Sequence, residues 1–198
     1  MPTGSRTPGG EDLAEFAGLA DLETERLHLR RFTTDDVAFV LNHFSEPRVS
    51  EYLVDAEPIR DPSEAAALIE WYVNPRRDNA NRWVLTLKSS LTAIGTCGYH
   101  NWSRRNRSAE IGYDLSPRFW LKGYMNEALS TAIKYGFEMM DLNRIQAFVH
   151  VRNERSLRAL SKLGFKIEGI IREKYLCRGQ YHDHACLSLL RRDWHHDL

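Results

Sequence analysis

The sequence predicts an α/β fold of the α+β type, built on a mixed, mostly antiparallel sheet of seven strands with helices on both faces. Three observations lead to this prediction. Seven short segments are predicted as strands, and the first of them, residues 26–32, alternates apolar and polar residues with the period of a half-buried strand. Four other segments are predicted as helices, two from apolar residues at every third or fourth position and two from the residues that begin or end them. Their chain order, β-α-α-β-β-β-α-β-α-β-β, fits a mixed sheet covered on both sides.

The N-terminal half supplies one strand and two helices before the centre of the sheet. Residues 26–32 alternate as a strand, and residues 33–44 follow with a threonine cap and apolar residues at helical spacing. Residues 61–73 form a second helix. It opens on Pro62 and Ser63, since proline fits the first turn of a helix.

Three consecutive strands and a long helix form the middle of the chain. Residues 82–90 and 93–102 are predicted to form a hairpin with a short polar turn, and residues 108–116 are the next strand. The helix that starts at Gly123 has one buried face, because its apolar residues recur at helical spacing. The residues of this apolar stripe are Met125, Ala128, Leu129, Ala132, Ile133, Phe137 and Met140.

The C-terminal part continues with a strand, a helix and two final strands. Residues 144–151 are the strand, and Asn153 caps the helix of residues 154–163. Gly164 closes that helix in a Schellman-type end, with Phe165 folded back on it. The last two strands are residues 165–176 and 182–194, with a turn at Arg178-Gly179-Gln180.

Length and composition predict one soluble globular domain. The chain has 198 residues, 42% of them hydrophobic, and 27 basic side chains balance 27 acidic ones. No overall field therefore favours nucleic acid or an anionic membrane. No apolar run approaches the roughly 20 residues that span a bilayer, and the N-terminus lacks the apolar core of a signal peptide. We expect a flexible tail at residues 1–21, one folded domain at residues 22–198, and a cytoplasmic monomer or homodimer.

The cysteines predict neither disulfides nor a metal site. Cys97, Cys177 and Cys186 are odd in number and form no C-x-x-C pair, which is typical of reduced thiols. Cys177 and Cys186 flank two histidines, His182 and His184, but this alternation lacks the spacing of zinc ligands. No metal is expected.

The start of the long helix indicates an anion site. The helix opens on Lys122 and Gly123, with no serine, threonine or aspartate in the capping position. Several backbone N–H groups therefore point outward, with the positive end of the helix dipole behind them. Phosphate is the usual anion in such a position, and Gly123 would let it approach the backbone. A tight turn that merely needs a glycine is the alternative interpretation.

A series of short motifs runs in order from about Leu22 to Trp194. The motifs are Glu110-Ile111-Gly112-Tyr113, Lys122-Gly123-Tyr124, Glu127-Ala128, Asn153-x-x-Ser156, Leu163-Gly164-Phe165-x-x-Glu168-Gly169, and the late Gly179 and Asp183. No single motif is specific. Their order and spacing together resemble the GNAT acetyltransferase superfamily, and within it the RimJ/RimL type. The resemblance implies a GNAT-like fold with the mixed sheet expected above.

The resemblance also implies a site for acetyl-CoA as cosubstrate. In the family, backbone amides of a loop with the pattern Gln/Arg-x-x-Gly-x-Gly/Ala hold the pyrophosphate, and the matching stretch here runs from Trp120 to Met125. Only Gly123 matches strictly. Met125 replaces the usual glycine or alanine, and its place on the apolar stripe predicts that it points into the core. The implied cofactor-binding residues are Tyr113, Asp114 and Leu115 beside the pantetheine arm, Lys122, Gly123, Tyr124, Met125 and Asn126 at the phosphates, and Asn153.

Glu110 is the first candidate for the base that removes a proton from the attacking amine. The resemblance places the thioester near residues 112–114, and Glu110 lies on the same strand face, two residues before Gly112. A glycine weakens a strand, so Gly112 indicates either the close approach of a ligand or a β-bulge. His100 on the neighbouring strand is the second candidate, since a lone histidine is more often structural.

Ser156 is the candidate that returns a proton to the departing CoA thiolate. In the family motif that Asn153-x-x-Ser156 matches, the asparagine contacts the pantetheine arm and the serine lies near the sulfur. Both residues also suit the first turn of a helix, where asparagine is a good cap. Glu173 and Tyr175 border the acceptor entrance in this subfamily, and with His100 they are the candidate substrate contacts.

The resemblance predicts an acetyl-CoA-dependent N-acetyltransferase that acts by direct attack in a ternary complex. The preferred acceptor is the α-amino group of a protein N-terminus. A small amine, such as an antibiotic, a polyamine or an amino acid, is the alternative. Leu121 and Met125 in the loop indicate a third alternative, a non-catalytic CoA-binding regulatory module. Residues 48–82 and 174–183, which surround the acceptor in the family, carry no motif that selects among these.

Overall fold

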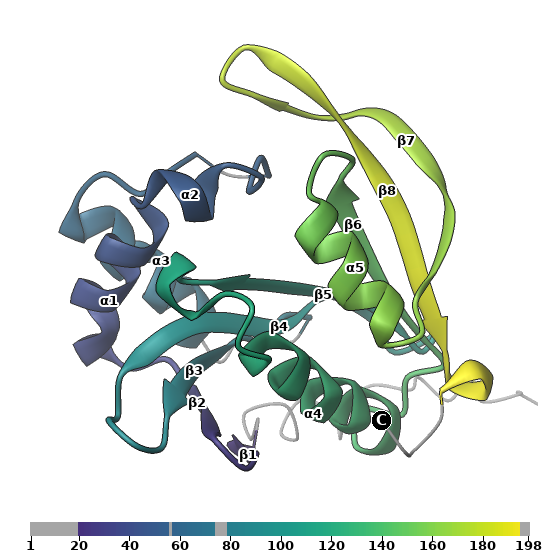
Figure 1. Cartoon of the computed structure of the whole chain (residues 1–198), viewed down its shortest axis with the longest axis horizontal. Coiled ribbons are helices and arrows are strands. Elements are labelled where there is room, and N and C mark those ends of the chain that lie inside the picture. Colours follow the sequence, from purple (N-terminus) through teal and green to yellow (C-terminus); the bar gives the residue numbers. More distant parts are fainter. Residues whose placement is uncertain (1–19, 56, 74–78, 195–198) are drawn as a thin grey trace, which may run out of the picture.

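Eight strands form one sheet in the computed structural model, which describes residues 20–55, 57–73 and 79–194 (Figure 1). The strands lie in the order β1-β2-β3-β4-β5-β6-β8-β7, and every neighbouring pair is antiparallel except β5 and β6. The predicted mixed, mostly antiparallel sheet is confirmed. The strands are β1 (Leu22–Glu23), β2 (Leu27–Arg31), β3 (Trp83–Leu87), β4 (Ala93–Ser103), β5 (Ser108–Leu115), β6 (Arg144–His150), β7 (Lys166–Cys177) and β8 (Gln180–Leu190).

Helices cover both faces of this sheet, as Figure 1 shows. Strand β3 contributes side chains to the cores on both faces of the sheet, because successive side chains point to opposite faces. Trp83 and Leu85 join the core beneath α4 and α5, whereas Val84 packs with α1 and α3. None of the helices in the described part of the chain is long and apolar enough to cross a lipid bilayer. The helices are α1 (Val37–Phe44), α2 (Pro47–Ser50), α3 (Pro62–Val73), α4 (Tyr124–Glu138) and α5 (Glu154–Lys162), with short 3-10 turns at Thr34–Asp36, Pro117–Phe119 and Arg191–Asp193.

The apolar stripe predicted for the long helix is the buried face of α4. Ala128, Leu129 and Ala132 are fully buried against the sheet. The hydroxyl of Tyr99 on β4 donates a hydrogen bond to the carbonyl of Ala132 at 2.9 Å. Gly136 leaves room for that ring, because a Cβ there would lie within 2.9 Å of Cζ of Tyr99. These contacts fix α4, and therefore its N-terminus, relative to the centre of the sheet.

Helix α5 ends in the Schellman motif predicted at Gly164. The N–H of Phe165 donates to the carbonyl of Leu160, and the N–H of Gly164 donates to that of Ser161, both at 3.1 Å. Gly164 has a φ angle of +87°, which glycine adopts without a Cβ penalty. The motif turns the chain sharply from α5 into β7.

Two short elements were not predicted from the sequence. Strand β1 adds an eighth strand to the predicted seven, pairing with β2 through Leu22 and Glu23. Two residues are too few to display an alternating pattern, which explains the omission. Helix α2 is a single turn, begun by Glu46, whose side chain accepts the N–H of Arg48. It supplies one wall of the site described below.

The described chain already contacts the sheet before the predicted start of the domain at residue 22. The carbonyl of Ala20 accepts a hydrogen bond from Nε1 of Trp83 at 3.0 Å. The carboxylate of Asp21 accepts the N–H of Arg31 at 3.2 Å. The rest of the predicted tail, residues 1–19, lies outside the described residues.

Candidate active site

A gap opens in the sheet where its two parallel strands separate. The register between them ends at Glu110 and Gln146, although β5 continues to Leu115 and β6 continues to His150. Figure 1 shows the two strands diverging from that point. Over this stretch the facing edges of β5 and β6 do not pair with one another. Their backbone groups can therefore bind an extended ligand that lies between them like an added strand.

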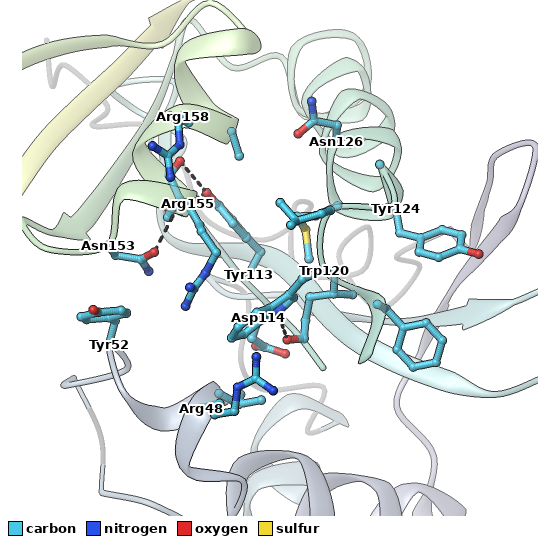
Figure 2. A pocket seen from close by; sticks show the side chains of 18 of the residues that line it. Arg48, Tyr52, Tyr113, Asp114, Trp120, Tyr124, Asn126, Asn153, Arg155 and Arg158 are labelled. Atoms are coloured by element: carbon cyan, nitrogen blue, oxygen red, sulfur yellow. Dashed lines mark hydrogen bonds between the residues drawn. The ribbon is translucent and has the colours of Figure 1, made fainter. Parts of the chain in front are cut away.

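A cavity of about 440 Å³ lies along the open end of this gap (Figure 2). Its walls come from the end of β5 with the loop that leads into α4, from the first turns of α5, and from α2. The cavity brings together nearly all the residues predicted to bind the donor and one predicted catalytic residue. They are Tyr113, Asp114, Leu115, Gly123, Tyr124, Met125, Asn126, Asn153 and Ser156.

The loop before α4 has the open helix start that was predicted. Gly123 is the N-cap of α4, and it has no side chain that could occupy the first N–H groups of the helix. Leu121 and Gly123 both have positive φ angles, +61° and +82°. A Cβ at Gly123 would lie 3.2 Å from Nη2 of Arg26, so both conformation and space call for glycine. Met125 is half-buried and packs against the main core, as its position on the stripe predicted.

An ion pair between Arg26 and Glu127 stabilises the loop before α4. The guanidinium of Arg26 pairs with the carboxylate of Glu127 at 2.6 Å and donates to the carbonyl of Lys122 at 3.0 Å. Burial raises the pKa of Glu127, but hydrogen bonds from Thr24 and Arg26 outweigh it and lower the pKa overall. The carboxylate is therefore ionised at neutral pH. Because these contacts end on Lys122 and on the first turn of α4, they fix the direction of the open N–H groups.

We expect Arg26→Gln to weaken CoA binding about tenfold, because the loop loses charge-assisted hydrogen bonds, whose loss costs about 1.5–3 kcal/mol. Calorimetric titration with CoA measures the effect. Arg26→Lys keeps the charge but cannot reach Glu127 and Lys122 at once, so its affinity should fall between the two. Unchanged affinity in both folded variants would show that the loop needs no support from this side chain.

Trp120 is packed between two guanidinium groups (Figure 2). Arg48 from α2 lies 4.8 Å from the centre of its ring, and Arg155 from α5 lies 4.0 Å from it. At these distances a cation is attracted to the face of an indole. The Nε1–H group of Trp120 donates to the carbonyl of Leu115 at 2.7 Å. Trp120 therefore joins the end of β5, α2 and α5 around the cavity.

Three basic side chains of α5 also line the cavity and were missed in the sequence. They are Arg155, Arg158 and Lys162. Their positions at i, i+3 and i+7 put them on one face of the helix, a signal that the sequence does contain. Their charge favours an anion, as does the open start of α4 on the other side of the cavity.

Asn153 and Ser156 occupy the first turn of α5, as predicted. The side-chain oxygen of Asn153 accepts the N–H of Ser156 at 3.2 Å, which confirms the cap. The hydroxyl of Ser156 lies 2.7 Å from the hydroxyl of Tyr113 on β5. Burial raises the pKa of Tyr113, so its hydroxyl keeps its proton at neutral pH. The two hydroxyls bridge the walls of the cavity and offer a proton there.

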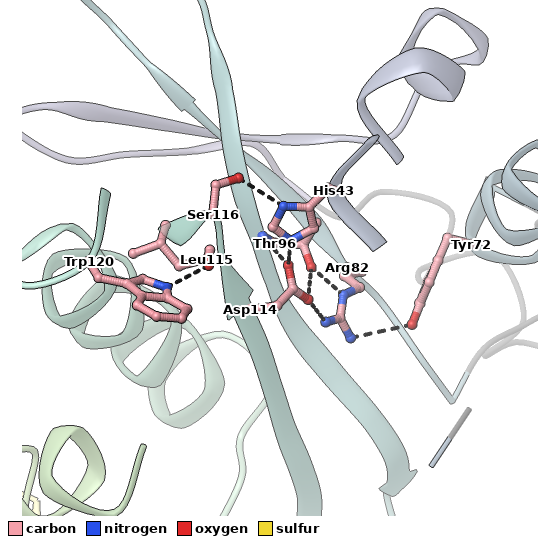
Figure 3. A network of polar contacts seen from close by, with 8 residues as sticks. All are labelled: His43, Tyr72, Arg82, Thr96, Asp114, Leu115, Ser116 and Trp120. Carbon is pink, nitrogen blue, oxygen red and sulfur yellow. Dashed lines mark hydrogen bonds and ion pairs between the residues drawn. The ribbon is translucent and has the colours of Figure 1, made fainter. Parts of the chain in front are cut away.

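The carboxylate of Asp114 belongs to a buried polar cluster on the other face of β5 (Figure 3). It lies 2.6 Å from Nε2 of His43 and 2.5 Å from Nη2 of Arg82, and the hydroxyl of Thr96 donates to it at 2.7 Å. Burial alone would raise the pKa of Asp114, but the charges of Arg82 and His43 lower it to about 2. The ionised carboxylate is engaged inside the protein. A contact from Asp114 to the pantetheine arm must therefore come from its main chain.

Glu110 and His100, the two candidate bases, form a pair where β5 and β6 separate. Nε2 of His100 lies 3.2 Å from the carboxylate of Glu110, and the side-chain amide of Gln146 donates to the same carboxylate at 3.3 Å. Burial raises the pKa of Glu110, but hydrogen bonds from His100 and Asn101, together with the charge of His100, outweigh it and lower the pKa overall. The carboxylate is ionised at neutral pH. It can accept a proton directly or through the imidazole.

Gly112 makes room for this pair. A Cβ at Gly112 would lie 3.1 Å from Cε1 of His100 and 3.5 Å from Nη1 of Arg82. The β4–β5 register runs through Gly98 and Gly112 without a shift at that point. A β-bulge, one of the two interpretations of this glycine, is therefore not what the structure shows. The absence of a side chain at Gly112 lets the imidazole of His100 and the guanidinium of Arg82 pack against β5.

Tyr175 and Glu173, the candidate substrate contacts on β7, differ from one another in burial. Tyr175 is half-buried, and burial together with the charges of Asp55 and Glu110 raises its pKa to about 12. Its hydroxyl is therefore within electrostatic reach of the proposed base. Glu173 is exposed, has a φ angle of +53°, and donates its N–H to the carboxylate of Asp183 at 2.8 Å. Glu173 marks an irregular point of β7, with its side chain at the surface.

The cysteines and histidines of the last hairpin lie apart from one another or contact main-chain groups. Within the described ranges, no three His, Cys, Asp or Glu side chains converge as ligands. A ring nitrogen of His182 lies instead 3.3 Å from the carbonyl of Cys177. Burial raises the pKa of the thiols of Cys177 and Cys186, which keeps both protonated at neutral pH.

The cavity fits the donor that the motifs imply. An open helix start and a basic helix face suit phosphate groups, and the separated edges of β5 and β6 suit an extended arm. The profile of the family described as "Acetyltransferase (GNAT) domain" matches residues 26–166, more than half of the chain. The chain belongs to the GNAT acetyltransferase family. It is an acyltransferase whose acetyl donor is acetyl-CoA.

Relatives of this acetyltransferase transfer the acetyl group to nitrogen. The uncharacterized N-acetyltransferase p20 of Bacillus licheniformis is 36% identical over 174 residues, which are 87% of this chain and 97% of that protein. The ribosomal protein uS5-alanine N-acetyltransferase of Escherichia coli is 28% identical over 183 residues, 87% of this chain and 92% of that one. The chain is therefore an acetyl-CoA-dependent N-acetyltransferase.

Solved structures of acetyltransferases share the fold. The ribosomal-protein-S5-alanine acetyltransferase of Vibrio fischeri matches 89% of this chain and 99% of its own, with a TM-score of 0.75 and 28% identity. The spermidine N-acetyltransferase of Vibrio cholerae, in complex with CoA and spermine, matches 84% of this chain and 96% of its own, with a TM-score of 0.75. At 23% identity, the second likeness concerns the fold alone.

Proposed function

We propose that this acetyltransferase acetylates a primary amine, and that its acceptor is the α-amino group of a protein N-terminus. The proposal is carried by the order of groups along β5. The open start of α4 lies beyond the C-terminal end of this strand, and the His100–Glu110 pair lies upstream, where the gap begins. An extended donor with its phosphates at Gly123 would present its reactive end beside the pair. The relative that acts on an alanine of ribosomal protein uS5 supports the α-amino group as the acceptor.

The residues around the cavity divide the binding of the donor between them. The N–H groups of residues 123–126 and the basic face of α5 would hold the phosphates. The edge of β5 from Gly112 to Leu115 would bind the pantetheine arm through its backbone. When bound, acetyl-CoA supplies an activated acetyl group on a thiol that leaves readily. The side chains of the protein then have two tasks, both concerned with protons.

The first task is to remove a proton from the amine, which must be neutral to attack. A free α-amino group titrates near about 8, so most of it is protonated at neutral pH. Glu110 is ionised and is held in place by His100 and Gln146. We assign Glu110 as the proton acceptor, either directly or through a water molecule or His100.

The second task is to return a proton to the leaving thiolate, which we assign to Ser156. We expect Ser156→Ala to lower turnover about a hundredfold and to change CoA affinity little, because general acids contribute about 10²-fold or more. Steady-state kinetics and calorimetry measure the two effects. Ser161→Ala is the matched control, since Ser161 is exposed on the same helix and away from the cavity. Turnover within about threefold of wild type would leave Ser156 with only its role in the helix.

A panel of acceptors tests the proposed function. Thiol release that depends on acetyl-CoA should be measured with free-N-terminus peptides, the same peptides with blocked N-termini, and small amines. Mass spectrometry of the products locates the acetyl group. Transfer to free N-termini, and not to blocked ones, supports the proposal. Turnover confined to small amines would replace the protein acceptor by a small molecule, and thiol release without any acetylated amine would contradict it.

A further inference from the structure

A second cavity, of about 900 Å³, lies between α1, α3 and the segment that links α2 to α3. It borders the first cavity at Leu53, which lines both. Arg82 also lines it, and Nη1 of Arg82 is 3.5 Å from the position that a Cβ of Gly112 would occupy. The side chain of Arg82 therefore connects the second cavity to β5 beside the His100–Glu110 pair.

The tip of the β7–β8 hairpin lies against the rim of this second cavity. Nη2 of Arg178 donates to the carbonyl of Ser50 at 3.3 Å, and Sγ of Cys177 lies 3.8 Å from the carboxylate of Glu57. Both Ser50 and Glu57 line the cavity. The hairpin thus narrows the approach to it. A slim and flexible acceptor fits this entrance better than a folded surface does.

Carboxylates dominate the charge of the second cavity. Its charged lining residues are Asp55, Glu57, Glu64, Arg60 and Arg82. The charge of Arg82 is offset inside the buried cluster of Figure 3, and Arg60 approaches Glu57 to 4.0 Å. Among the described residues, neither Asp55 nor Glu64 is paired with a cationic side chain, although one oxygen of Glu64 accepts the backbone N–H of Arg60 at 2.7 Å. The lining therefore keeps an excess of negative charge.

The walls of the second cavity are aromatic and apolar. Phe44, Trp71 and Tyr72 line it, and the rings of Trp71 and Tyr72 meet edge to face with their centres 4.7 Å apart. The carboxylates of Asp55 and Glu64 belong to exposed residues, whereas these rings are half-buried. Aromatic faces attract cations, and apolar walls accept alkyl chains. Such a cavity suits a chain that carries a cation at its far end.

We propose that the second cavity receives the acceptor and selects amines that carry a second positive charge on a short flexible chain. The reacting amine has to be neutral at the His100–Glu110 pair, so it is not the charge that the exposed carboxylates recognise. Asp55 and Glu64 bind the distal ammonium or guanidinium group instead. The inference rests on the proposed transfer to a primary amine and narrows its acceptor. A protein N-terminus that is followed by a basic residue belongs to this class.

Two dipeptide amides of equal length, alanyl-lysinamide and alanyl-norleucinamide, test the selection. They share the α-amino group and differ in the distal ammonium. Binding to the CoA-loaded protein is measured by calorimetry at low ionic strength, and transfer is measured separately by kinetics with mass spectrometry of the product. We expect alanyl-lysinamide to bind about tenfold more tightly and to have a correspondingly lower KM, with a similar kcat.

Asp55→Asn and Glu64→Gln locate the recognition. Each should reduce the preference for alanyl-lysinamide several-fold and leave binding of alanyl-norleucinamide unchanged. Glu70→Gln is the matched control, because Glu70 is an exposed carboxylate of α3 that does not line the cavity. The preference should also weaken as salt is added, since exposed charges are screened.

Each result decides one question. Equal binding of the two dipeptides, or a preference that both variants retain in full, would overturn the acceptor class proposed for this cavity. A preference that Asp55→Asn and Glu64→Gln reduce supports it. If that preference is found but neither dipeptide is acetylated, the cavity is supported and the proposed function is contradicted.

Discussion

We expect Gly123→Glu to abolish CoA binding while the protein still folds. The substitution places a carboxylate at the N-cap of α4, where the open N–H groups would hold the phosphates. It also adds a Cβ at a φ angle of +82°, 3.2 Å from a guanidinium nitrogen of Arg26. Repulsion between two anions and loss of the open helix start act in the same direction. We expect an affinity at least about a hundredfold weaker by calorimetry.

Two other substitutions separate the effect of the added charge from the effect of the added side chain. Gly123→Ala adds the strain and the contact with Arg26 without a charge, and we expect it to weaken binding much less. Gly169→Glu adds the same carboxylate at a glycine of β7 with open space around it, and it should bind CoA as wild type does. Wild-type affinity in a folded Gly123→Glu protein would move the phosphates away from α4.

Glu110→Gln should lower turnover about a hundredfold at neutral pH, because the amide can still accept a hydrogen bond but no longer a proton. The loss should shrink as pH rises through the pKa of the acceptor amine, near about 8 for an α-amino group. Above that pH, most of the amine is already neutral and needs no base. The measurement is the pH–rate profile of wild type and variant on one good acceptor.

His100→Asn completes this experiment. If the imidazole passes the proton to Glu110, both variants lose turnover to a similar extent and their losses shrink together at high pH. If Glu110 acts directly, the loss in His100→Asn is the smaller one. Profiles of wild type and Glu110→Gln that run parallel at all pH values, together with a lower melting temperature, would make Glu110 structural.

Elements whose pattern repeats over several residues were predictable from the sequence. The seven longer strands and the helices α1, α3, α4 and α5 were predicted from apolar patterning or from the turn and cap residues that bound them. Gly123 and Gly164 were recognised by the backbone conformations that glycine allows. The two-residue β1 and the single turn α2 were not, because neither is long enough to show a period. Tertiary pairing forms β1, and local capping forms α2.

The candidate site could be predicted only where neighbours in the sequence make it. The donor loop and the first turn of α5 are such segments. Tyr113 pairs with Ser156, which lies 43 positions further along the chain. Asp114 pairs with His43, which lies 71 positions before it. No local pattern encodes those distances. The second cavity is built in the same way, from segments on either side of α3 that carry no motif of their own.

The buried cluster around Asp114 links the two cavities, because Asp114 lines the first and Arg82 lines the second. His43 comes from α1, Arg82 directly precedes β3, and Asp114 lies on β5. The buried carboxylate and guanidinium would each be an unpaired charge in the interior without the other. A chain in which β5 has formed but α1 has not docked is therefore disfavoured. We therefore expect β5 and the helices around the second cavity to unfold in one cooperative transition. His43 and Arg82 are therefore constrained by the carboxylate of Asp114, which also lines the first cavity.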